Sequence, residues 1–140
     1  SISIRKGSTE VTESSDIYQF LESSMEFTTS CSYSSAPYYY SLGELFEECY
    51  TGNNCLNDKN SCDVLNETLI QILKGSWGTE LEGGNIKGYE FQASYKVNSS
   101  EQGKDIILIK EGNCSGSIKG ASYLSRAFPG TIESSLKLCF

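Results

Sequence analysis

The stretch KGYEFQASYKV, residues 87–97, decides the fold class. Every second position carries an apolar or aromatic side chain: Tyr89, Phe91, Ala93, Tyr95 and Val97. The residues between them are polar, and this period of two predicts a β-strand with one buried face. The segments before and after this strand predict the rest of the fold.

Two further strands are predicted downstream. Residues 104–111, KDIILIKE, follow a turn at 98–104 and are apolar on both faces, so we expect this strand to lie centrally in a sheet. A loop rich in Gly, Ser and Asn follows. Residues 131–140, TIESSLKLCF, alternate again and predict a last strand that reaches the chain end.

Upstream of residue 87 the apolar period becomes helical. Ile17, Phe20, Leu21 and Met25 predict a helix that Ser15 caps. A second helix is predicted over 42–50, because Ser41 and Glu44 form a capping box. The third helix, over 62–74, is expected to stop at Gly75.

The remaining segments predict one short strand and two loops. Residues 1–11 open with Ile2 and Ile4 alternating with polar residues, which indicates a strand or arm. Residues 28–41 are expected to form a Ser/Tyr-rich loop, and residues 51–61 an Asn-rich one. The predicted fold is α+β: a short N-terminal strand, three helices, then an antiparallel β-meander. Residues 12–140 form a single globular domain in this interpretation.

Six cysteines in 140 residues, without a C-x-x-C motif or any histidine, favour three disulfides over a metal site. We expect bridges that reinforce an extracellular domain. Fifteen pairings are possible, but Cys114 and Cys139 both border predicted strands and are expected to bridge within the sheet. The other four would then staple the helices and their loops: Cys31, Cys49, Cys55 and Cys62.

Composition and charge exclude several classes of function. The net charge of −7 disfavours nucleic acid and anionic membranes as partners. The chain lacks histidine, the usual general base, and a solvated helix face explains the cluster Glu44, Glu47 and Glu48 better than a catalytic carboxylate pair. The Asn-rich loop fails the EF-hand pattern, so we expect neither a metal nor a cofactor. No apolar run is long enough to span a membrane, which fits a processed exported protein or an ectodomain.

Three Asn-x-Ser/Thr sequons are candidates for covalent N-glycans. Asn98 lies in a predicted hairpin turn and is the strongest candidate. Asn66 falls on a predicted helix, and Asn113 is crowded by the adjacent Cys114.

Two segments are candidates for assembly or recognition. Tyr38, Tyr39 and Tyr40 belong to a Tyr-rich loop that suits a contact surface, or that packs over the domain's own helices. The strand carrying Ile2 and Ile4 is able to pair with the open sheet of a neighbouring subunit, or to form an edge strand in its own sheet.

Several stretches together resemble exported pilin-like and surface-filament proteins of archaea. They are SLGELFEECY (41–50) before a Cys-containing loop, NETLIQILKGSWG (66–78) leading into KGYEFQASY (87–95), and a last strand, TIESSLKLC (131–139), that ends on Cys. Such proteins usually carry an N-terminal hydrophobic helix, which this sequence lacks. The resemblance implies a cell-surface location and a structural role, and carries over no catalytic residue.

The function expected from the sequence is therefore a structural subunit of an extracellular filament or surface assembly. It would form a homo-oligomer or polymer, with donor-strand exchange through residues 1–11. The alternative is a monomeric binding ectodomain of a membrane-anchored protein that recognises glycan or protein through the Tyr-rich loop.

Overall fold

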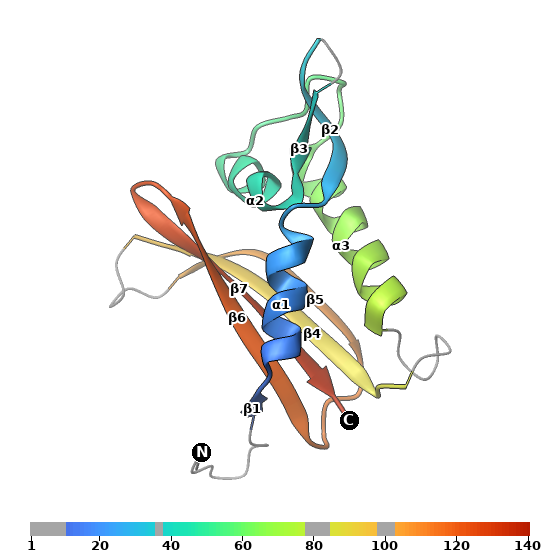
Figure 1. Cartoon of the computed structure of the whole chain (residues 1–140). Coiled ribbons are helices and arrows are strands. Elements are labelled where there is room, and N and C mark those ends of the chain that lie inside the picture. The colour runs from blue at the N-terminus through green and yellow to red at the C-terminus, as the bar shows by residue number, and fades with distance from the viewer. Residues whose placement is uncertain (1–10, 36–37, 78–84, 98–102) are drawn as a thin grey trace.

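The computed structural model of this chain describes residues 11–35, 38–77, 85–97 and 103–140. A five-stranded sheet carries helices on one face, and a separate two-stranded hairpin rises beyond them (Figure 1). The elements follow in the order β1 (Val11–Glu13), α1 (Ser15–Ser24), β2 (Thr28–Ser34), β3 (Tyr38–Ser41), α2 (Leu42–Thr51), α3 (Ser61–Trp77), β4 (Gly88–Lys96), β5 (Lys104–Gly112), β6 (Ile118–Ala127) and β7 (Gly130–Cys139). The α+β class and its antiparallel C-terminal strands confirm the prediction from sequence.

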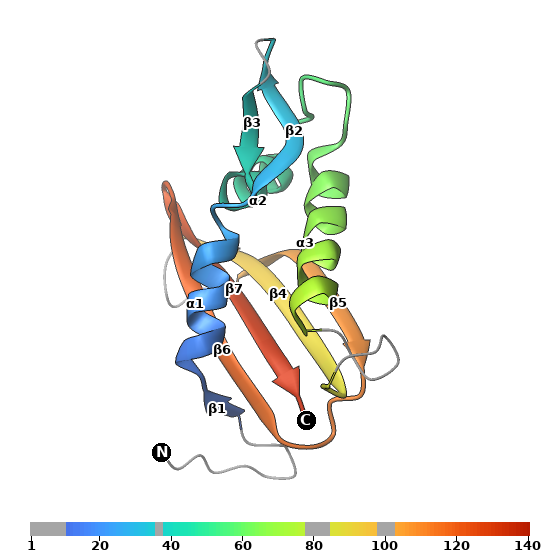
Figure 2. The ribbon, with the colours of Figure 1, turned by 45° about the vertical axis from the view of Figure 1, so that its right-hand side comes forward.

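The strands of the large sheet run in the order β1-β6-β7-β4-β5. The central strand is β7, which pairs antiparallel with β4 on one side and β6 on the other. The prediction that residues 104–111 lie centrally is wrong, because β5 is the outermost strand (Figure 2). Its apolar run reflects burial of one face against the helices, while Leu108 on the other face stays 48% exposed.

One strand lies where a loop was expected. β6 pairs with β7 over ten residues, from Ile118 opposite Cys139 to Ala127 opposite Gly130. Its sequence, IKGASYLSRA, places small side chains such as Ala121 at inward positions, so the hydrophobic alternation is weak. Pairing with the central strand, and not local propensity, makes this segment a strand.

The Ser/Tyr-rich segment is also not a loop. β2 and β3 form an antiparallel hairpin with register shifts along its length. Residues such as Ser32 and Thr29 are buried in it. The sequence prediction failed here because a polar β2, TTSCSYS, lacks the apolar alternation that marks a strand.

The helices begin and end slightly differently from the sequence prediction. Ser14, not Ser15, caps α1: its backbone is extended, and its side-chain oxygen accepts a hydrogen bond from the Ile17 amide at 3.3 Å. The capping box of Ser41 and Glu44 at the start of α2 is confirmed in both directions. Gly52 ends α2 at a φ of +80°, which glycine adopts without strain.

α3 does not stop at Gly75 but continues to Trp77. Glycine inside a helix costs about 1 kcal/mol relative to alanine. The last turn is supported by the Trp77 ring, which meets the Phe20 ring of α1 edge-on at 5.5 Å. This contact lies between distant parts of the chain, so the local stop signal did not reveal it.

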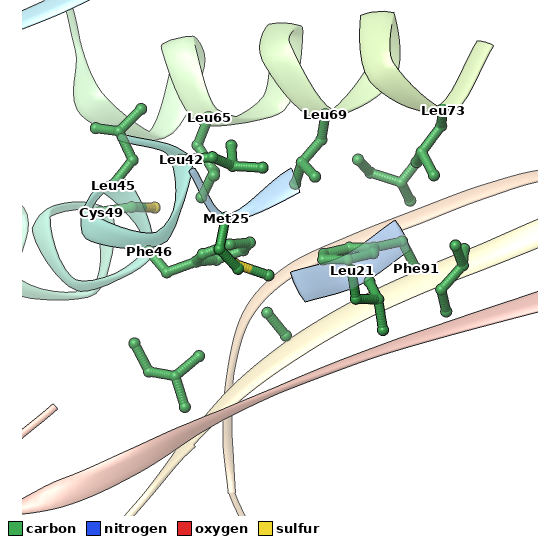
Figure 3. Close-up of a cluster of buried hydrophobic side chains, with 14 of the residues drawn as sticks. Leu21, Met25, Leu42, Leu45, Phe46, Cys49, Leu65, Leu69, Leu73 and Phe91 are labelled. Atoms are coloured by element: carbon green, nitrogen blue, oxygen red, sulfur yellow. The ribbon is translucent and has the colours of Figure 1, made fainter. Parts of the chain in front are cut away.

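The core lies between the helices and the inner face of the sheet (Figure 3). Phe91 of β4 and Phe46 of α2 stack at 6.0 Å between ring centroids, and both side chains are 1% exposed. Leu65, Leu69 and Leu73 point down from α3 onto the same cluster (Figure 3).

The outer face of the sheet carries polar cross-strand pairs. Gln92 and Ser94 of β4 both donate hydrogen bonds to Asp105 of β5, at 2.8 and 3.2 Å. Lys110 of β5 pairs with Glu90 of β4 at 3.9 Å. This face is therefore built for solvent or polar contact, with Leu108 as an exposed apolar side chain within it.

Three disulfides link the fold, and every cysteine is bonded. Cys114 and Cys139 bridge at the end of the sheet, which confirms that predicted pair. Cys31 joins β2 to Cys55 in the loop after α2. Cys49 of α2 is bonded to Cys62 of α3. The bridges fall into a sheet group and a helix–hairpin group, as the sequence predicted.

Several sequence predictions fall outside the described residues. Ile2 and Ile4 belong to residues 1–10, and Asn98 belongs to residues 98–102. The donor strand, the division at residue 12 and the preference for Asn98 therefore remain predictions.

Candidate functional surfaces

The β2–β3 hairpin presents a cluster of tyrosines. Tyr33 of β2 lies against two rings of β3, with centroid distances of 4.9 Å to Tyr40 and 6.1 Å to Tyr38. The side chains of Tyr33 and Tyr38 are 50% and 59% exposed. We call these three residues the tyrosine cluster. Tyr33 and Tyr38 contact other rings of the hairpin, whereas Tyr40 also packs against the core. A contact surface and packing over the helices both remain predictions for these tyrosines.

A disulfide and several hydrogen bonds tie the hairpin to the loop after α2. The buried Cys31 ties β2 to the loop at Cys55, and the Leu56 amide donates to the Ser32 carbonyl at 2.7 Å. The side-chain amide of Asn57 donates to the Ser30 carbonyl at 2.9 Å. The Asn-rich loop therefore serves as a brace for β2, a role that the sequence did not reveal.

Tyr40 connects the tyrosine cluster to α2. Burial of its ring raises the pKa of the Tyr40 hydroxyl above its ordinary value. The negative charge of Glu48, which also forms a hydrogen bond with the hydroxyl, raises this pKa further, and Glu44 adds a smaller effect. The Tyr40 hydroxyl is thus held by its hydrogen bond to Glu48, while the side chains of Tyr38 and Tyr39 are exposed.

A polar cleft of about 430 Å³ lies between the hairpin and α3. It is lined by Phe27, Thr28, Thr29, Ser30, Tyr39, Asn57, Lys59, Thr68 and Gln71. An adjoining, more apolar cleft of about 530 Å³ between α1 and α3 shares Phe27 and Gln71 with it. Together they form a groove that combines two exposed aromatic rings, Phe27 and Tyr39, with hydroxyl and amide groups.

The sheet offers two stretches of open edge. Within the described residues, no strand pairs with the outer side of β5 over its nine residues. On the opposite side, β1 covers only Ile118 to Gly120 of β6, so positions 121–127 have no second strand partner among the residues described. Open edges present backbone groups that are able to pair with another strand.

Two sequons can be placed. Asn66 is exposed on α3, but the Thr68 of its sequon is 7% exposed. Asn113 is exposed, and its side-chain oxygen accepts a hydrogen bond from the Ser115 amide at 3.0 Å beside the Cys114–Cys139 bridge. Both asparagines reach solvent, and occupancy by glycan remains a prediction.

The described residues contain no group of three or more His, Cys, Asp or Glu side chains placed to hold a metal ion. Glu44 and Glu47 lie exposed on α2, where the Glu44 carboxylate completes the capping box by accepting a hydrogen bond from the Ser41 amide. In the described part of the chain, no helix is both long enough and apolar enough to cross a bilayer.

The comparisons with known proteins assign no family. No protein-family model matches the chain, and no curated protein matches it. Function must therefore be argued from the surfaces themselves.

The sequence pointed to the tyrosines but missed the groove and the β5 edge. The groove joins Phe27 to Gln71, which are far apart in sequence and are brought together only by packing of α3 beside β2. The apolar run Ile106–Ile109 predicts a strand at β5, but it does not distinguish an edge strand from a central one.

Proposed function

We propose that this chain is a structural subunit of an extracellular filament or cell-surface assembly, which polymerises through contacts between subunits. The observation that carries the proposal is the open edge of β5, nine residues long with Ile106–Ile109 at its centre. An open apolar edge on a folded domain favours strand pairing with another chain. The proposal includes donation of residues 1–11 to a neighbour.

The disulfides support a role in a durable extracellular part. Disulfides persist in oxidising compartments, and three of them fit an extracellular protein. They close chain separations of 24, 13 and 25 residues, and each closure stabilises the fold by about 3 kcal/mol on the chain-entropy model.

A donated strand needs an open sheet edge to pair with. We propose positions 121–127 of β6 as that edge. β1 already pairs parallel with the first part of β6, from Val11 opposite Ile118. A strand from a neighbour would extend this edge, with Ile2 and Ile4 supplying its apolar side.

Deletion of residues 1–10 tests strand donation, because it leaves β1 intact. Electron microscopy of native and truncated protein at equal concentration is the measurement. Loss of polymers in the truncated protein, with the three disulfides still formed, supports donation. Polymers of unchanged length and number rule it out.

A role without catalysis is part of the same proposal. The chain has no histidine, and the described residues contain no metal-holding cluster. The groove is lined mostly by hydroxyl, amide and aromatic groups, which bind ligands by hydrogen bonding and stacking. Its two charged residues, Lys59 and Glu26, line different clefts of the groove.

The alternative function is a monomeric ectodomain of a membrane-anchored surface protein that binds glycan or protein. The groove favours it, because exposed rings beside amides and hydroxyls suit sugar faces and their hydroxyl groups. Titration of the full chain with neutral oligosaccharides, followed by amide NMR shifts, is the test. Saturable shifts at Tyr39 and Gln71 that disappear in Tyr39→Ala would support it, and an unchanged spectrum would exclude it for those sugars.

A further inference from the structure

We propose that β5 pairs antiparallel with β5 of a second copy of this chain, so that two sheets join across a two-fold axis. The inference rests on the proposed function, because it names one of the contacts between subunits. The occupant is fixed by the sequence of β5 itself, KDIILIKEG, together with the faces to which its side chains point.

The faces of β5 follow from its register with β4. Leu108 lies opposite Gln92, and Lys110 opposite Glu90, so both point to the outer polar face. Asp105 joins this face through its hydrogen bonds from β4. The inward positions are Lys104, Ile107, Ile109 and Glu111, which pair with Tyr95, Ala93, Phe91 and Tyr89.

β5 has one more residue than β4 in the paired stretch, and this extra residue sets which side chains of β5 can lie opposite those of a second copy. The register shifts between Ala93 and Ser94, so that Ile106 is an extra residue in β5. A two-fold axis normal to a sheet places residues of the same face opposite one another. If Leu108 lies opposite its own copy at this axis, Ile107 lies opposite Ile109 of the second copy.

On the N-terminal side of Ile106, the same register places oppositely charged side chains opposite one another. Asp105 on the outer face lies opposite Lys110 of the second copy. Lys104 on the inner face lies opposite Glu111 of the second copy. Symmetry doubles each pair, so the contact has four ion pairs around an aliphatic centre.

Other registers fail this test. A shift by two residues in one direction places Lys104 opposite Ile109, and a shift in the other direction places Lys110 opposite Leu108. A parallel pairing in register places each charge opposite itself, which is unfavourable. Charges and bulges usually protect an edge strand from indiscriminate pairing. Here they permit one antiparallel register.

The pairing also accounts for Leu108. Its side chain is 48% exposed on a face whose neighbours, Gln92 and Lys110, are polar. In the paired sheet it lies against its own copy and loses most of this exposure. The backbone groups along the open side of β5 gain hydrogen-bond partners at the same time.

A charge-exchange pair of variants tests the contact in the full chain. Lys104 and Glu111 are both exposed, and neither takes part in the cross-strand pairs on the outer face. Lys104→Glu turns two attractive contacts into two repulsive ones and should weaken self-association about tenfold by analytical ultracentrifugation. Adding Glu111→Lys to the same chain should restore it. The result that overturns the proposal is equal weakening by both variants or an effect of neither.

A thiol at the axis supplies a second, independent measurement. Leu108→Cys should form a disulfide-linked dimer under mild oxidation, because opposite Cβ atoms in a sheet lie about 5 Å apart. Lys137→Cys is the matched control, since Lys137 is also exposed on the outer face but lies on the central strand β7. Equal crosslinking of the two variants would contradict the proposal.

Deletion of residues 1–10 separates this contact from the wider function. Association that survives the deletion but fails in Lys104→Glu supports the β5 contact. Association that is lost on deletion and unaffected by the β5 variants overturns this contact while leaving assembly by strand donation intact. A chain that is monomeric in every form, at all concentrations, overturns both.

Discussion

Phe46 packs α2 against the sheet. Its ring is 1% exposed and stacks on Phe91 (Figure 3). We expect Phe46→Ala to lower the free energy of unfolding by about 3–5 kcal/mol, because it removes buried area and leaves a cavity. Denaturant unfolding followed by circular dichroism measures this loss. Leu56→Ala, at a side chain 59% exposed, is the control and should change stability by less than about 0.5 kcal/mol.

Tyr40 predicts a pH dependence at the alkaline end. Burial and the charge of Glu48 raise its pKa in the folded chain above the unfolded value of 10.0. The folded state therefore holds this proton more tightly, and the stability gained from it is present below pH 10 and lost as pH rises through the folded pKa. Between pH 8 and 11, the free energy of unfolding should decrease more steeply with pH for the native chain than for Tyr40→Phe. The same pH dependence in the two proteins would show that Tyr40 does not contribute to the loss of stability at high pH.

The capping role of a residue can be predicted from the sequence when its partner lies only a few positions away. Ser41 and Glu44 lie three positions apart and cap each other, so their spacing suffices. Ser14 and Ser15 are equally good caps by type. The choice between them depends on where β1 ends, because the Ser14 amide donates to the Gly120 carbonyl of β6 at 3.0 Å. That contact is invisible in the sequence.

At the scale of elements, the start of α2 can be tested through Ser41. Ser41→Ala removes the oxygen that accepts from the Glu44 amide at 3.3 Å. We expect a loss of about 1 kcal/mol in the free energy of unfolding. Ser41→Thr keeps a capping oxygen and should retain most of that stability. A full loss in the threonine variant would show that the cap is not the cause.

The hairpin supplies a second prediction for an element. Replacing Cys31 and Cys55 together by serine should speed amide hydrogen exchange across β2 and β3, because this bridge ties the hairpin to its brace. Hydrogen exchange followed by mass spectrometry locates the effect. The matched control replaces Cys114 and Cys139, and its faster exchange should be confined to the sheet. Faster amide exchange throughout the chain in both variants would contradict a local role for each disulfide.

The elements that the sequence missed share a physical cause. β2 and β6 are polar or small in composition, and pairing makes them strands: β2 with β3, and β6 with the central β7. β4 and β7 were predictable because their alternation matches one buried face, with Phe91 directly opposite Leu136. The hydrophobic period predicts strands at β4, β5 and β7 but not their order in the sheet, and the predicted central position of β5 is wrong for that reason.

For the whole molecule, the sequence predicted the two disulfide groups and the α+β class, because cysteine positions and periodicity are local features. The candidate surfaces needed the fold. The groove requires α3 beside β2, and the self-complementary edge requires the extra residue Ile106 and the faces it sets. The proposals for ligand binding and self-association rest on these two features, the groove beside α3 and the edge strand β5.

We expect the native chain to associate with itself. Sedimentation equilibrium of the native full chain, over a concentration range up to about millimolar, tests it most directly. The predicted result is an average mass that rises with concentration through twice the monomer mass, and that falls back in Lys104→Glu. A mass equal to that of the monomer at every concentration would contradict the claim.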